Sequence, residues 1–298
     1  MKEHSPLVLP HRAATVVAVD DEALQLIAMA LAEDRGPGDW TTRWTVSART
    51  RGEAQIVAKA EGVIAGVGLA AAVFLRLDPR VEIDVAVSDG GSVRPGDVVC
   101  DVRGPARAML TGERVALNFL QRLSGIATLT RRYVDALKGT GTKVLDTRKT
   151  TPGWRSLEKG AVRAGGGANH RAGLYDMVMI KDNHKAIAGG LAAAVARVRD
   201  QNTRELPICV EVHSLAELDD ALAAGVDRLL LDNMDVETLT SAVKRAQRAR
   251  PRPQLEASGN MTLKRVRQVA ETGVDFISVG ALTHSAPALD LSMRFRLP

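Results

Sequence analysis

The chain has 298 residues, of which 45% are hydrophobic and 25% charged, enough for one large domain and a smaller one. The net charge of +5 and the pI near 9.4 would suit a nucleic-acid-binding protein. Only 3% of the residues are aromatic, however, and no RNA-binding or helix-turn-helix motif occurs. We therefore expect no nucleic-acid partner.

The first residues and the cysteines indicate the compartment. Pro6 and Pro10 interrupt the first segment, so it lacks the apolar stretch of a secretory signal. No apolar run approaches the roughly 18 residues of a membrane span. Cys100 and Cys209 lie far apart in apolar runs, which is typical of buried thiols in a reducing compartment. We expect a cytoplasmic protein with no membrane partner, and a loose leader over residues 1–20.

The first helix is predicted over residues 21–34, where apolar residues recur at helical spacing and Gly36 and Pro37 follow. We interpret Asp20 or Asp21 as its cap. An acidic ligand pair is the alternative, but a helix follows where such a pair would need a phosphate-binding loop.

Residues 55–102 contain β-branched runs separated by glycine-rich turns, with a helical segment over 68–78, and this pattern predicts an antiparallel α+β domain. A long helix is predicted from Thr111. Arg114 falls in its first turn, where a cation opposes the helix dipole. An anion partner and a solvated arginine are both consistent with that position.

From residue 143 onward, apolar strands alternate with helical segments, a pattern that predicts a parallel sheet covered by helices. Six strands can be counted, and a seventh short strand could be present at a place that the pattern does not give. This number of strands favours a β/α barrel over an open sheet. The expected strands are 143–146, 177–181, 208–212, 228–232, 254–258 and 276–280, and the helices are 157–164, 187–199, 215–223, 236–249 and 263–271.

The predicted fold is therefore an α/β chain with an incomplete β/α barrel and a smaller N-terminal α+β sandwich domain. We expect the barrel over residues 112–285 and the smaller domain over residues 21–111 plus 286–298.

Charged residues follow several of the predicted strands, at the barrel face where active sites form. Arg148, Lys149, His170, Arg171 and Lys181 all fall between the first two strands or at their ends. Cations brought together in this way repel one another unless an anion is present. The sequence thus predicts a pocket for a small, highly charged acid.

The motifs that carry this pattern are similar to those of the quinolinate phosphoribosyltransferase family, also called nicotinate-nucleotide pyrophosphorylase (carboxylating). The resemblance covers nearly everything from about residue 21 onward. Its motifs lie at residues 33–42, 112–128, 146–184, 210–218, 229–234, 255–260 and 272–295. His213 stands where relatives often carry another polar residue.

The resemblance implies transfer of a phosphoribosyl group from phosphoribosyl pyrophosphate to quinolinate, with Mg²⁺ as cofactor and with release of carbon dioxide. Quinolinate is a dianion. Arginine suits it because the planar guanidinium group binds a carboxylate through two hydrogen bonds at once. By the family pattern, quinolinate binds to Arg148, His170, Arg171 and Lys181, and to Arg114 of the neighbouring subunit. Lys149 would act on the pyrophosphate side.

The family pattern also gives roles to acidic and glycine-rich positions. Glu211 and Asp232 would contact ribose hydroxyls and Mg²⁺ and stabilise a cationic ribose carbon. An ion pair between Glu211 and Lys181 is the competing interpretation. A phosphate site is expected where backbone N–H groups can approach an anion, at Ser258, Gly259, Asn260, Gly280 and Ala281.

The resemblance implies a homodimer with shared active sites, and leaves higher assembly open. Two other enzymes are alternatives. One is a related protein found with molybdate-transport genes, and the other is a nicotinate-specific enzyme. The full set of carboxylate-binding cations argues against both. A non-catalytic nucleotide sensor is the alternative from another class, and would be expected to lack Lys149, Glu211 or Asp232, all of which are present.

Overall fold

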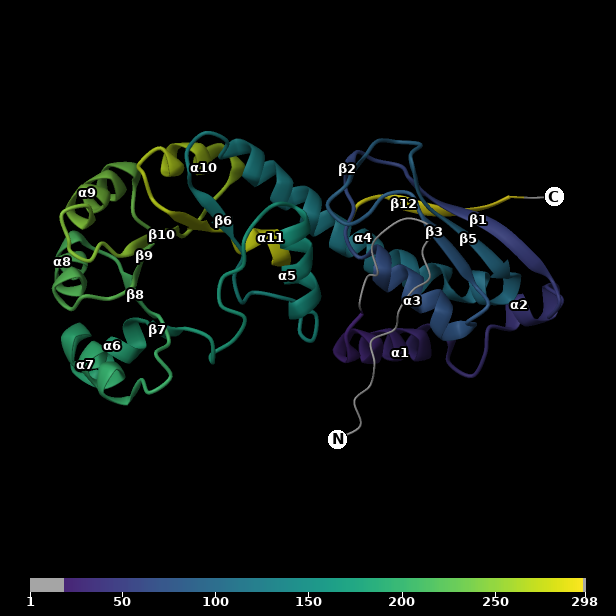
Figure 1. Ribbon diagram of the computed structural model, residues 1–298, viewed down its shortest axis with the longest axis horizontal. Coiled ribbons are helices and arrows are strands. Elements are labelled where there is room, and N and C mark those ends of the chain that lie inside the picture. The colour runs from purple at the N-terminus through teal and green to yellow at the C-terminus, as the bar shows by residue number, and fades with distance from the viewer. Residues whose placement is uncertain (1–18, 297–298) are drawn as a thin grey trace. The chain divides into compact units, whose positions relative to one another are not determined.

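The computed structural model describes residues 19–296 (Figure 1). The chain forms two compact units. The first unit contains the chain up to Leu129, residues 152–165 and the segment from Ala286, and the barrel unit contains residues 130–151 and 166–285. The predicted leader lies outside the described residues except for Val19 and Asp20. The predicted boundary near residue 111 stays a prediction.

The first unit is built on an antiparallel sheet, in which long strands pair in the order β12-β1-β5-β3. A second pair, β2 and β4, stands apart from it. The bounds are β1 Arg51–Ala58, β2 Gly62–Val63, β3 Glu82–Val85, β4 Ser92–Val93, β5 Val98–Pro105 and β12 Leu291–Arg296. The last strand, β12, returns to pair with the first strand, β1.

Most helices of the first unit follow the sequence pattern, but α2 was not predicted and α4 begins earlier than predicted. Asp20 caps α1 by accepting a hydrogen bond from the Ala23 N–H at 2.8 Å, which confirms the predicted cap. The long helix α4 begins at Ala106 rather than Thr111, so Arg114 does not lie in its first turn and the dipole argument for it was wrong. The bounds are α1 Asp21–Arg35, α2 Trp40–Thr45, α3 Val67–Leu77, α4 Ala106–Ala136 and α5 Arg155–Ala164.

The barrel unit contains six parallel strands in the order β6-β11-β10-β9-β8-β7. Within the described residues, β6 and β7 form the two edges and do not pair with each other, so the barrel is incomplete, as predicted. An isolated bridge between Leu145 and Ala168 extends the β6 edge. The bounds are β6 Lys143–Leu145, β7 Val178–Ile180, β8 Ile208–Val212, β9 Arg228–Asp232, β10 Gln254–Ser258 and β11 Phe276–Ser278.

Helices α7 to α10 lie outside these strands (Figure 1). The prediction of a single helix over residues 187–199 was wrong. Gly189 and Gly190 take φ values of 86° and 122° and separate α6 from α7. The alanine-rich run on both sides carried a helical pattern across this break. The bounds are α6 Asp182–Ala188, α7 Leu191–Gln201, α8 Leu215–Ala223, α9 Val236–Ala246, α10 Leu263–Ala270 and α11 Ala281–His284.

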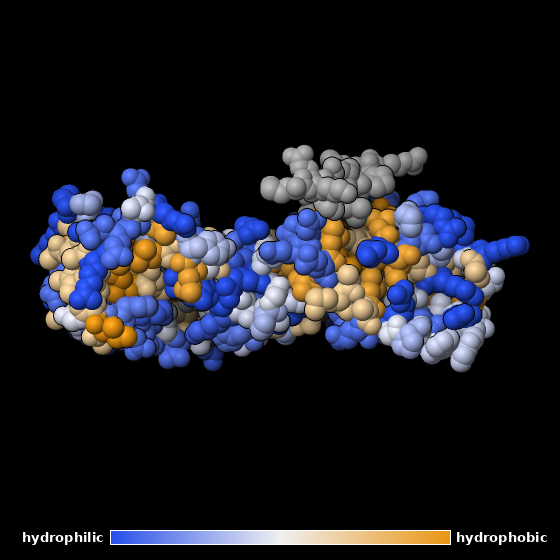
Figure 2. Space-filling view, turned by 90° about the horizontal axis from the view of Figure 1, so that it is seen from below, coloured by the Kyte–Doolittle hydropathy of each residue, from blue (hydrophilic) through white to orange (hydrophobic). Residues whose placement is uncertain are grey.

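Both units have apolar interiors and mixed surfaces. Cys100 and Cys209 are buried and unbridged, as predicted, and burial raises the pKa of the Cys100 thiol to about 12. On the face drawn in Figure 2, hydrophilic surface alternates with hydrophobic areas in both units. Among residues 19–296, no helix combines the length and the apolar character needed to cross a bilayer.

Gly125 marks the closest packing of α4 in the first unit. A Cβ atom at this position would lie 2.0 Å from the carbonyl oxygen of Pro287, a backbone atom that cannot rotate away. Gly125→Ala should therefore lower the stability to urea by about 1–3 kcal/mol, the usual cost of overpacking.

Gly160→Ala in α5 is the matched control, because a Cβ there would meet only the end of the Arg163 side chain at 3.7 Å. Alanine should be neutral or stabilising by up to about 1 kcal/mol at a helical position of this kind. Equal urea midpoints for the two variants would contradict the close approach at Gly125.

Candidate functional site

The carboxyl ends of the parallel strands open on a cavity of about 820 Å³ within the barrel unit. The register keeps these ends level, since Ser258 pairs with Asp232 and Ser278 pairs with Leu145. The cavity is lined by every predicted site residue of this unit, namely Arg148, Lys149, His170, Arg171, Lys181, Glu211, Asp232, Ser258, Gly259, Asn260, Gly280 and Ala281. Arg114 is exposed on α4 in the first unit. The individual roles stay predictions.

Crowding of like charge is the main electrostatic feature of the cavity. Burial and, after it, the nearby charge of Arg148 hold the pKa of Arg171 below its ordinary value. One Nη1–H of Arg171 donates to the carbonyl oxygen of Met177 at 3.1 Å, which fixes the guanidinium in place. An anion placed between the two arginines would relieve their repulsion.

Lys181 and Glu211 meet on neighbouring strands. The Lys181 Nζ donates to Glu211 Oε2 at 2.8 Å, and the Glu211 side chain is 13% exposed. The ion pair that competed with a ligand role for Glu211 is therefore present. It occupies one carboxylate oxygen of Glu211, and the other oxygen faces His213 Nε2 at 3.8 Å.

Glu256 forms a fully buried polar centre at the cavity. Its side chain is 0% exposed, and its carboxylate lies 3.1 Å from His170 Nε2 and 3.4 Å from Arg228 Nη1. The Ser278 hydroxyl also donates to it. Burial alone would raise the pKa of Glu256, but His170, Ser278 and the charge of Arg228 outweigh it and hold the pKa below the ordinary value.

Contacts on both sides of its ring hold His170 in place. Its Nδ1 accepts a hydrogen bond from the Arg171 backbone N–H at 2.6 Å, which assigns the ring proton to Nε2, facing Glu256. Its backbone N–H donates to Asp146 Oδ1 at 2.8 Å. Asp146, at the end of β6, also accepts from the Asn169 side chain and is fully buried. These contacts fix the glycine-rich connection beside the cavity.

The turns after β9 and β10 interlock. A Cβ at Gly259 would lie 2.1 Å from the Asn233 side-chain oxygen, and Gly259 has a φ of 96°, so only glycine fits. Asn233 and Asn260 also have positive φ values, of 56° and 48°. The Asn233 N–H donates to the Ser258 carbonyl oxygen at 3.0 Å, which ties the two turns together.

Lys149 lies on the β11 side of the cavity. A Cβ at Gly280 would come within 3.2 Å of both the Lys149 side chain and the His284 Nε2 atom. The Thr283 hydroxyl donates to the Lys149 carbonyl oxygen at 2.8 Å. Lys149, His284 and the Gly280 backbone thus meet at one place, as a site for a phosphate-bearing ligand requires.

The cavity lining also includes residues that were not predicted as site residues, among them Asn233, Glu256, Ser278 and His284. His284 stands one helical turn after Gly280, a spacing that could have indicated it. Glu256 stands at a strand end, but its partners come from other strands and a loop, which no local pattern connects.

The fold and the charged cavity define a barrel enzyme with a site for anionic substrates. Family models agree with this class: the N-terminal domain of quinolinate phosphoribosyl transferase matches residues 39–124, and its C-terminal domain matches residues 126–294. The chain belongs to the quinolinate phosphoribosyl transferase family.

Individual relatives agree over most of the chain. It is 48% identical to a probable nicotinate-nucleotide pyrophosphorylase [carboxylating] of Synechocystis sp. over 264 residues, 89% of each protein. It is 45% identical to the protein of that name in Bacillus subtilis, over 88% of this chain and 89% of the relative. The crystal structure of NadC from Streptococcus pyogenes superposes with a TM-score of 0.90 at 40% identity, covering 94% of this chain and 98% of that one.

The buried Glu256 carboxylate predicts a specific pH dependence of stability. Because its pKa is lowered in the fold, its ionised form stabilises the fold above the unfolded-state value near 4.5. That contribution is lost as the pH falls from there through the folded-state pKa. The urea midpoint of the wild type should therefore fall more between about pH 6 and pH 3 than that of Glu256→Gln.

Glu237→Gln serves as the control, because Glu237 is an exposed acid in the first turn of α9. It should keep the wild-type loss of stability in acid. An equally steep loss in Glu256→Gln would show that the ionised Glu256 contributes nothing to the fold.

Proposed function

We propose that the protein transfers the phosphoribosyl group of phosphoribosyl pyrophosphate to quinolinate and releases pyrophosphate, carbon dioxide and nicotinate mononucleotide. The gathering of Arg148 and Arg171 at one cavity carries this proposal, because an anion of high charge would offset their repulsion. The names of the relatives support it. The product is a pyridine nucleotide, so we also propose a role in NAD biosynthesis.

Quinolinate would bind on the arginine side of the cavity. Its two carboxylates would be met by the guanidinium groups of Arg148 and Arg171 and by the Lys181 ammonium, which is 48% exposed. His170 would form part of the wall, since its Nε2 proton faces Glu256. Two carboxylates match this set of cations better than the single carboxylate of nicotinate.

The phosphoribosyl group would lie on the opposite side, at the turns after β9 to β11. Backbone N–H groups of Gly259, Asn260, Gly280 and Ala281, together with the Ser258 hydroxyl, are of the kind that binds a phosphate without a lysine. Lys149 at Gly280 would bind the pyrophosphate.

Glu211 and Asp232 are the residues that would hold Mg²⁺. They fit this ion because both are carboxylates, line the same cavity and are partly buried, at 13% and 21% exposure. Mg²⁺ usually takes one or two protein carboxylates and completes its shell with waters and substrate phosphates. When bound, it supplies positive charge that stabilises the departing pyrophosphate.

In the proposed reaction, the chain holds the pyridine nitrogen of quinolinate against C1 of the ribose. The C1–oxygen bond to pyrophosphate breaks, Lys149 stabilises the leaving group, and the nitrogen bonds to C1 with inversion. Glu211 and Asp232 stabilise the positive charge on the ribose carbon. The alkylated ring nitrogen is then positive, so the C2 carboxylate leaves as carbon dioxide, and C2 takes up a proton.

Product release gives the direct test. Purified protein with quinolinate carrying a labelled C2 carboxylate, phosphoribosyl pyrophosphate and Mg²⁺ should release one labelled carbon dioxide per nicotinate mononucleotide formed. Lys149→Ala should lower the rate by at least about tenfold, since it removes a charge from the leaving group. Surface variant Lys244→Ala on α9 is the control and should keep the wild-type rate. No product in the wild type would overturn the proposal.

We further propose a homodimer with shared active sites. Arg114 belongs to the first unit, whereas the other proposed quinolinate ligands belong to the barrel unit. In a two-fold dimer, Arg114 of one subunit would complete the cavity of the other. The cytoplasmic location also stays a prediction.

Mixing two inactive variants tests the shared site. Arg114→Ala and Lys181→Ala proteins should each be inactive, and after subunit exchange the mixed dimer would contain one site with neither substitution. With random exchange about half the dimers are mixed, so about a quarter of the wild-type activity should return. Subunit exchange verified by mass spectrometry, with no recovery of activity, would show that Arg114 does not act across an interface.

A further inference from the structure

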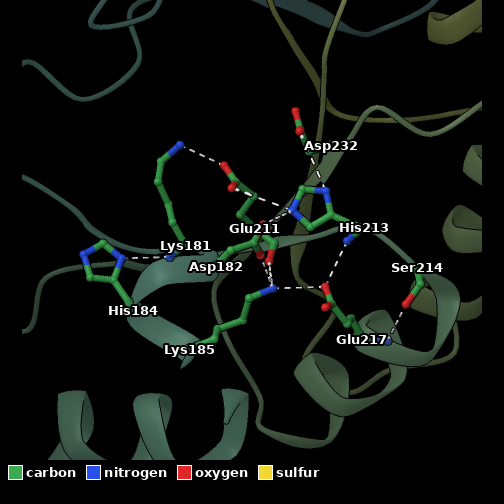
Figure 3. A network of polar contacts seen from close by, with 9 residues as sticks. All are labelled: Lys181, Asp182, His184, Lys185, Glu211, His213, Ser214, Glu217 and Asp232. Atoms are coloured by element: carbon green, nitrogen blue, oxygen red, sulfur yellow. Dashed lines mark hydrogen bonds and ion pairs between the residues drawn. The ribbon is translucent and has the colours of Figure 1, made fainter. Parts of the chain in front are cut away.

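A histidine and two carboxylates meet where β7 and β8 end. Asp182 is the first residue of α6, Glu211 lies in β8, and His213 follows β8 directly. One ligand atom from each lies within 4.8 Å of the other two. Figure 3 shows the imidazole ring of His213 standing among the carboxylates of Asp182, Glu211 and Asp232. We call Asp182, Glu211 and His213 the imidazole site.

The distances within the imidazole site suit one small cation. His213 Nε2 lies 2.8 Å from Asp182 Oδ2 and 3.8 Å from Glu211 Oε1. A divalent ion with ligands at about 2.0–2.2 Å holds neighbouring ligand atoms about 3–3.5 Å apart. Small side-chain rotations would bring the three atoms to such an ion.

Lysines orient both carboxylates toward the ring. Lys185 Nζ lies 2.8 Å from Asp182 Oδ1, and Lys181 Nζ lies 2.8 Å from Glu211 Oε2. Each lysine therefore occupies one oxygen, and the other oxygen of each carboxylate faces His213 Nε2 (Figure 3). The carboxylates are thus already turned toward a common point, which lowers the cost of ordering them around an ion.

His213 is itself fixed in position. Its backbone N–H donates to Glu217 Oε2 at 3.0 Å, and Ser214 caps α8 by accepting from the Glu217 N–H at 3.2 Å. Its second ring nitrogen, Nδ1, faces Asp232 Oδ2 at 3.8 Å. Metal-binding histidines commonly direct their other nitrogen toward a carboxylate, which orients the ring and makes the ligating nitrogen more basic.

We propose that the imidazole site binds a divalent cation of the zinc class, such as Zn²⁺ or Co²⁺, at a place that shares Glu211 with the proposed Mg²⁺ site. Imidazole nitrogen favours these ions, whereas Mg²⁺ prefers oxygen ligands and gives up its waters reluctantly. Without a cation, both His213 and Lys185 pair with Asp182, whose side chain is 57% exposed. Binding needs neither substrate, so the proposal stands apart from the proposed function.

Calorimetric titration of the metal-free, tag-free protein with ZnCl₂ tests this site. We expect one Zn²⁺ per chain, an excess of Mg²⁺ that does not displace it, and a visible absorption band when Co²⁺ replaces it. His213→Asn should weaken the binding by more than about tenfold, because loss of a merely supporting partner already costs 10–100-fold.

His184→Asn is the matched control. His184 is exposed on α6, and its Nδ1 accepts from the Lys181 N–H at 3.0 Å, away from the three ligand atoms (Figure 3). It should bind Zn²⁺ as the wild type does. Asp182→Asn provides a second variant if His213→Asn fails to fold, and should also weaken binding.

Equal Zn²⁺ affinity in the wild type, His213→Asn and Asp182→Asn would overturn the proposal, and so would the absence of saturable binding. Either result would assign the contact between His213 and Asp182 to an ion pair alone. Because the titration uses the cation by itself, such a result would leave the proposed reaction untouched.

Discussion

Repulsion between cations that line one cavity is the constraint on which the site depends. Arg148 and Arg171 come from different loops and stand close enough for one to lower the pKa of the other. Such an arrangement lowers the stability of a fold unless a ligand or acidic side chains offset it. Acidic side chains supply part of this compensation, because carboxylates on β8 to β10 line the same cavity as the cations.

The parallel sheet brings these charged residues to one cavity. Neighbouring strands end at the same level, so single residues at successive strand ends become neighbours in space. Glu256 is an example of such long-range contact, since its buried carboxylate contacts His170, Arg228 and Ser278 from three other segments. A network of this kind stiffens the cavity wall.

The alternation of apolar strands and helices predicted the barrel, because the strands are largely apolar and polar residues stand at or just after their carboxyl ends. The break at Gly189 and Gly190 was missed, since the alanines around it have the same helical spacing as one continuous helix. The start of α4 was placed late for a similar reason, because β5 passes into it at Ala106 without a polar turn.

The candidate site likewise has a part that the sequence predicted and a part that it did not. Residues that stand in ordered motifs at strand ends, such as Lys181 and Asp232, were predicted from the sequence as site residues. They line the cavity, and their roles stay predictions. The ion network of Glu256 and the contacts of His213 were not predicted, because their partners lie 20 or more positions away or approach only through the fold. Local patterns carry no information on which strand ends will face each other.

The most direct measurement of the central claim is the ratio of kcat/KM for quinolinate to that for nicotinate, with phosphoribosyl pyrophosphate and Mg²⁺ held constant. If the crowded cations are a site for two carboxylates, quinolinate should be preferred by more than about a hundredfold, since nicotinate has no second carboxylate to bind the remaining cations. Equal kcat/KM values for the two acids would contradict the dianion site.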